Sequence, residues 1–115
     1  MRRVFLALIS AVGLLLPLEG RANDYPTEAV ADYVLGCMAA NGQTATALRQ
    51  CSCSIDVIAS LLSFDDYTTA ETILRMRQVQ GGGERMAIFR ETPFAKDAID
   101  KLRRAQTEAE VRCFL

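Results

Sequence analysis

Four cysteines downstream of an export signal constrain this chain more than any other feature. The N-terminus carries Arg2 and Arg3, continues through an apolar run over residues 4–18, and ends on small residues at Gly20 and Ala22. This pattern is typical of a cleavable secretory signal, and the run is shorter than the roughly 20 residues needed to cross a bilayer. We therefore expect a signal peptide over residues 1–22 and a mature, periplasmic domain over residues 23–115 without a membrane span.

All four cysteines, Cys37, Cys51, Cys53 and Cys113, lie in the mature part. A small domain buries a modest core, and cysteines in an oxidising compartment form disulfides, which argues against a copper-thiolate or thiol-redox role. Four cysteines allow three pairings. On a helix Cys51 and Cys53 point about 200° apart, which disfavours a bridge or a chelate between them. Cys51 shares the apolar face nearer the connecting turn, so pairing with Cys37 is favoured, which leaves Cys53 for Cys113.

Apolar residues recur at three- and four-residue spacing in four segments, which predicts four helices. The first should span residues 27–40. Thr44 should cap the second, which runs to about residue 62, and the third should run from the break at residues 63–66 to the glycines at 81–83. Thr92 and Pro93 signal the start of a fourth helix, which reaches Cys113. Residues 84–91 are expected to form a loop. The predicted fold is a small all-α domain of four helices stapled by two disulfides.

Composition excludes several classes of function. The chain has no histidine, which removes the commonest general base and the usual imidazole metal ligand. No pair of nucleophile and base can be proposed, so we expect no enzyme. Without its signal the chain keeps ten basic and thirteen acidic residues, a net charge of about −3, which argues against nucleic acid as a partner.

The remaining candidate site is acidic and consists of Asp65, Asp66 and Glu71. Adjacent carboxylates in a turn offer the hard oxygen ligands that calcium or a lanthanide prefers, although the spacing is not that of an EF-hand. Aspartates also cap helix N-termini, and Glu71 can pair with Arg75 one turn later. Three carboxylates do not fill the roughly 6–8 positions around such an ion, so water or a second subunit would complete the site.

The order of features over residues 25–114 resembles a known family. Cys37 is followed by Cys-Ser-Cys at 51–53, Phe-Asp-Asp-Tyr at 64–67, Ala-Glu-Thr at 70–72 and Arg-Met-Arg at 75–77. The chain is similar to small periplasmic proteins associated with pyrroloquinoline-quinone alcohol dehydrogenases and lanthanide-dependent methanol oxidation, and most similar to the landiscernin type of lanthanide chaperone. The resemblance implies a protein that binds a light lanthanide through carboxylates and hands it on, with a metal-bridged homodimer as one form.

The leading hypothesis is a periplasmic lanthanide carrier that binds the ion through Asp65, Asp66 and Glu71, with calcium as the alternative ion. Its partner would be a periplasmic dehydrogenase or another metal carrier. The alternative is an interaction partner or assembly factor for a periplasmic quinoprotein dehydrogenase that binds no metal and uses residues 86–89 or a helix face. A holdase chaperone is a third hypothesis, which the lack of histidine makes weaker.

Overall fold

The computed structural model describes residues 23–78, 83, 87 and 90–115. This part of the chain forms α1 (Thr27–Asn41), α2 (Ala45–Leu61), α3 (Phe64–Gln78) and α5 (Pro93–Phe114), and it contains no strand. The prediction of an all-α domain with four helices is confirmed. None of the helices in the described ranges is both long and apolar enough to cross a membrane. The expected signal peptide over residues 1–22 lies outside the described residues.

The prediction of a loop over residues 84–91 is wrong at the three positions that the structure describes. Ala87, Arg90 and Glu91 are helical. Neither glycine nor proline occurs between residues 84 and 91, so the sequence holds no residue that would break a helix there. The other residues of this stretch lie outside the described part of the chain.

Hydroxyl side chains cap the N-termini of three of the helices. Thr44 accepts a hydrogen bond from the Ala47 amide at 3.0 Å, and Thr92 accepts one from Ala95 at 3.2 Å, as their predicted N-cap roles require. Ser63 accepts from the Asp66 amide at 3.1 Å, a cap that was not foreseen. Because Ser63 takes this role, α3 begins at residue 64.

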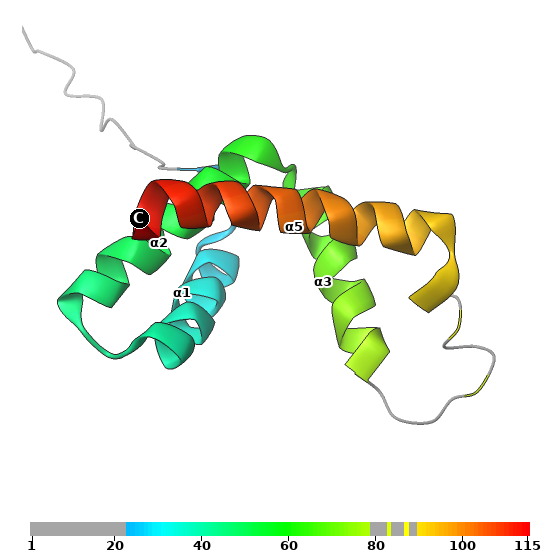
Figure 1. Ribbon diagram of the computed structural model, residues 1–115, viewed down its shortest axis with the longest axis horizontal. Helices are drawn as coiled ribbons and strands as arrows, with labels where there is room; N and C mark the ends of the chain where they lie inside the picture. Colours follow the sequence, from blue (N-terminus) through cyan, green and yellow to red (C-terminus); the bar gives the residue numbers. More distant parts are fainter. Residues whose placement is uncertain (1–22, 79–82, 84–86, 88–89) are drawn as a thin grey trace, which may run out of the picture.

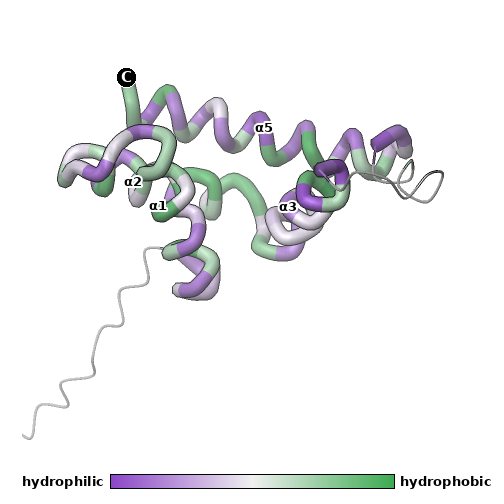
Figure 2. The backbone as a smooth tube through the Cα atoms, turned by 90° about the horizontal axis from the view of Figure 1, so that it is seen from below, coloured by the Kyte–Doolittle hydropathy of each residue, from purple (hydrophilic) through white to green (hydrophobic). Residues whose placement is uncertain are grey.

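The long helix α5 lies across α2 and α3, and α1 packs on α2 (Figure 1). Hydrophilic and hydrophobic positions alternate along α5 (Figure 2), and its buried residues follow helical spacing: Ala95, Ile99, Leu102, Ala105 and Ala109. Leu102 is fully buried, as are Ile55 and Ile58 of α2. The apolar face of α5 therefore closes the core over α2 and α3.

The helix α1 is apolar in composition but has no buried residue. Val30, Tyr33 and Val34 are partly buried against the core. Tyr25, just before α1, is buried, and its hydroxyl donates a hydrogen bond to the Leu62 carbonyl at 2.7 Å. This anchor fastens the start of α1 to the junction of α2 and α3.

Two disulfides staple the helices, with the predicted pairing. Cys37 is bonded to Cys51, which joins α1 to α2, and Cys53 is bonded to Cys113, which joins α2 to the end of α5. No cysteine of the described part is left as a free thiol. Disulfides of this kind indicate an oxidising, secreted environment.

Candidate functional site

The three predicted ligands lie on different sides of α3. On an ideal helix Asp65 and Asp66 are separated from Glu71 by about 120° and 140° of rotation, so the three carboxylates do not face one ion from within a single chain. Asp65 is exposed at the first turn. Asp66 lines a hollow together with three basic side chains of α5, Lys101, Arg104 and Arg112. Glu71 faces a separate groove.

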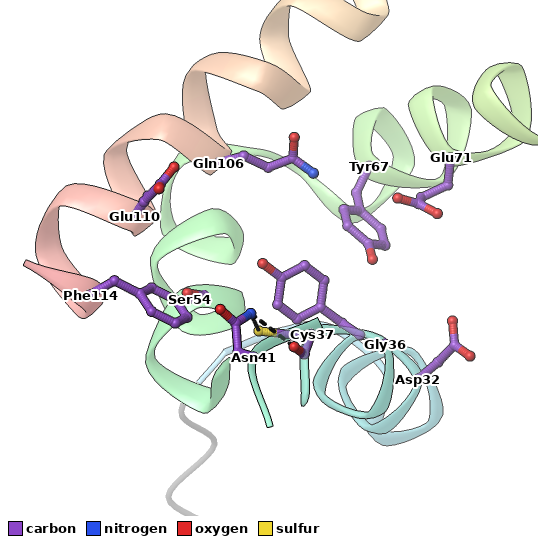
Figure 3. A pocket seen from close by; sticks show the side chains of 11 residues that line it. Asp32, Gly36, Cys37, Asn41, Ser54, Tyr67, Glu71, Gln106, Glu110 and Phe114 are labelled. Atoms are coloured by element: carbon purple, nitrogen blue, oxygen red, sulfur yellow. Dashed lines mark hydrogen bonds between the residues drawn. The ribbon is translucent and has the colours of Figure 1, made fainter. Parts of the chain in front are cut away.

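This groove, of about 530 Å³, lies where α1, α3 and α5 face one another beside α2 (Figure 3). Its polar lining includes three carboxylates and two phenols, contributed by Asp32, Glu71, Glu110, Tyr33 and Tyr67. None of the described residues that line it is a lysine or an arginine, although Asp32 and Glu71 also border an adjoining hollow that contains Arg75. We refer to this hollow as the acidic groove.

Asp32 of α1 and Glu71 of α3 lie at the same end of the acidic groove (Figure 3). Burial is the main cause that raises the pKa of Glu71, the Arg75 guanidinium lowers it, and the Asp32 carboxylate raises it further. The net direction is upward. Glu71 is half-buried, whereas Asp32 is exposed. The two carboxylates come from different helices and repel each other, and a cation beside both would relieve this repulsion, as Arg75 already does in part for Glu71.

The two tyrosines are held neutral by the same surroundings. Burial raises the pKa of Tyr67, and the negative charge of Glu71 is the next largest cause. The pKa of Tyr33 is raised by burial, lowered by a hydrogen bond with Ser54 and raised by Glu71. At neutral pH both phenols are protonated, so they offer hydroxyl groups and ring faces to a ligand, while the carboxylates provide the charge.

Sequence reasoning missed Asp32 and Glu110 as site residues, although α1 carries a usable signal. It contains Glu28 and Asp32 and no basic residue, so neither acid has a partner at helical spacing within its own helix. More broadly, residues 23–74 contain seven acidic residues and one basic residue. This charge segregation indicates an acidic surface that the C-terminal half does not share.

Over the residues that the structure describes, no three histidine, cysteine or acidic side chains lie close enough together to hold one metal ion. No protein-family model, curated protein or solved structure matches this chain.

Replacing Glu71 with glutamine is expected to raise the melting temperature at pH 7. The folded-state pKa of Glu71 lies above its ordinary value of 4.5, so the folded protein binds this proton more tightly than the unfolded chain does. The stabilisation is present below about pH 4.5 and is lost as pH rises through the folded-state pKa. Thermal melts over a pH series should therefore show the variant and the native protein converging in acid.

The matched control is Glu108→Gln, which removes a carboxylate that pairs with Arg112 at 2.7 Å and does not line the acidic groove. It should not raise the melting temperature at pH 7. A Glu71→Gln protein that melts below the native protein at pH 7 would show that the contact with Arg75 outweighs the cost of burial.

Proposed function

We propose that this chain is a periplasmic carrier of a hard metal ion, with a trivalent lanthanide as the cargo, and that it has no catalytic role. The pairing of Asp32 with Glu71 across the acidic groove carries the proposal. Carboxylate and hydroxyl oxygens are the ligands that such ions prefer. With no histidine in the chain and the cysteines consumed in disulfides, oxygen is the main ligand chemistry that remains.

Two carboxylates and neighbouring hydroxyls leave several of the roughly 6–8 positions of a large cation to water. An open coordination shell suits a protein that must hand its ion to another, because the receiving protein can add ligands before the first ones leave. The resemblance to lanthanide chaperones agrees with this role. Calcium is the alternative ion, and a periplasmic dehydrogenase or metal carrier would be the recipient.

A terbium titration tests the proposal. The chain has no tryptophan and three tyrosines, two of which line the acidic groove, so terbium bound there should emit when tyrosine is excited. We expect sensitised emission at micromolar terbium, lost in the Asp32→Asn/Glu71→Gln double variant. Absence of emission and of binding heat in the native protein would overturn the proposal.

The matched control is the Asp65→Asn/Asp66→Asn double variant, which removes the same charge from the opposite side of α3. Emission that survives in this control and fails in the groove variant would locate the ion in the acidic groove. The reverse result would locate it at the turn predicted from the sequence. Molecular mass measured with and without terbium tests the metal-bridged dimer, which requires the mass to double.

A second candidate function is an interaction partner that binds no metal, and the outer side of α1 favours it. Leu35 is 68% exposed on a helix without any buried residue, so its apolar side chain remains available to another protein. Of residues 86–89, the other surface proposed for this role, only Ala87 is described, and it is half-buried. Replacement of Leu35 by glutamate should abolish capture of a dehydrogenase under this hypothesis and leave terbium binding unchanged.

A further inference from the structure

The acidic groove has carboxylates at two separated ends. Asp32 and Glu71 lie at one end, whereas Glu110 lies toward the other end with Phe114 (Figure 3). This separation agrees with the absence of any three-residue metal cluster in the described part of the chain. A compact ion held by Asp32 and Glu71 would therefore leave Glu110 unused.

Glu110 differs in its surroundings from Asp97 and Glu108, two other acidic residues of α5. Asp97 forms an ion pair with Lys101 at 3.4 Å, and Glu108 forms one with Arg112 at 2.7 Å. In both pairs the basic residue lies one helical turn after the acidic residue. The residues one turn before and after Glu110 are Gln106 and Phe114, which carry no charge. Among the described residues Glu110 thus has no cationic partner, and it faces a groove that contains none.

Between the two ends the groove offers neutral groups that suit an aliphatic cation. Tyr67 and Gln106 extend into this middle part (Figure 3), and Tyr33 also lines the groove. Tyrosine faces attract ammonium groups through the ring quadrupole and pack well against methylene groups. Amide and hydroxyl oxygens accept hydrogen bonds from ammonium donors.

We propose that the acidic groove also binds linear aliphatic polyamines, with one ammonium group between Asp32 and Glu71 and a second against Glu110. The methylene chain lies over the tyrosines between the two ends. A ligand of this shape neutralises all three carboxylates at once, which no compact ion does in this groove. The polyamine proposal does not rest on the proposed metal cargo, although both ligands would use the end formed by Asp32 and Glu71.

Calorimetric titrations with spermidine, cadaverine and butylamine, in buffer with a metal chelator, test this proposal. The monoamine can occupy only one end, so we expect the diamine and the triamine to bind at least about tenfold more tightly than butylamine. Glu110→Gln should reduce their affinity to that of butylamine and leave butylamine binding unchanged. Undetectable spermidine binding, or equal affinity for cadaverine and butylamine, would overturn the proposal.

Glu108→Gln is the matched control, because it removes the same charge from the same helix outside the groove. An equal loss of spermidine affinity in the two variants would indicate nonspecific attraction to an acidic protein and would also overturn the proposal. Terbium emission separates this result from the metal proposal. Glu110→Gln should keep terbium binding, whereas Asp32→Asn/Glu71→Gln should lose both ligands.

Discussion

Replacing Cys53 and Cys113 together with alanine is expected to lower the free energy of unfolding by about 4 kcal/mol. The bridge connects residues 60 positions apart, and in the chain-entropy model a crosslink of that span restricts the unfolded chain by this amount. A domain the size of the mature chain has a free energy of unfolding of about 5–14 kcal/mol. The variant should therefore lose more than about a quarter of its stability. Both cysteines are only half-buried, so alanine should leave little strain in the folded state.

Urea unfolding followed by circular dichroism measures this loss. The matched control is the Cys37→Ala/Cys51→Ala variant, whose bridge spans 14 positions and should contribute at most about 3 kcal/mol. The long bridge should therefore have the larger effect. If its removal costs less than removal of the short bridge, the apolar face of α5 holds that helix in place without the crosslink.

The sequence predicts the helices well because their signals are local. Thr44 and Thr92 cap the helices that they were expected to cap, and the apolar period of α5 matches its buried face. The same periodicity favours the pairing of Cys51 with Cys37, because it places Cys51 on the apolar face of α2 near the connecting turn, and the structure shows this bridge with Cys51 buried. Each of these inferences needs only the geometry of one helix and the residues that flank it.

The candidate site was harder to predict because it depends on how separate helices meet. Asp65 and Asp66 are adjacent in the sequence, but neighbouring residues of a helix point in directions about 100° apart. Asp66 lies beside basic side chains of α5. Asp32 and Glu71 are 39 positions apart and share a groove only after α1 and α3 are placed. Asp32 and Glu71 lie close together because of how α1 and α3 pack, and the apolar period of a single helix gives no information about that packing.

Removal of the Cys37–Cys51 bridge by alanine substitution is expected to weaken binding in the acidic groove at least about tenfold while most of the fold remains. Because α1 has no buried residue, its attachment depends strongly on this bridge to α2 and on the anchor at Tyr25. Without the bridge the C-terminal part of α1 should leave α2, and Asp32 and Tyr33 would no longer face Glu71. If the groove is formed in less than about a tenth of the molecules, the apparent dissociation constants for terbium and spermidine rise at least about tenfold.

Hydrogen exchange separates this local release from general unfolding. In the Cys37→Ala/Cys51→Ala variant the amides of α1 should exchange rapidly, whereas those of α2 and α5 should remain protected, because the core around Ile55 and Leu102 does not depend on α1 for its main contacts. The Cys53→Ala/Cys113→Ala variant should show the opposite pattern, with α1 protected and the end of α5 exposed to exchange. Protected α1 amides together with undiminished terbium and spermidine binding would show that Tyr25 and the partly buried side of α1 hold the groove together without the disulfide.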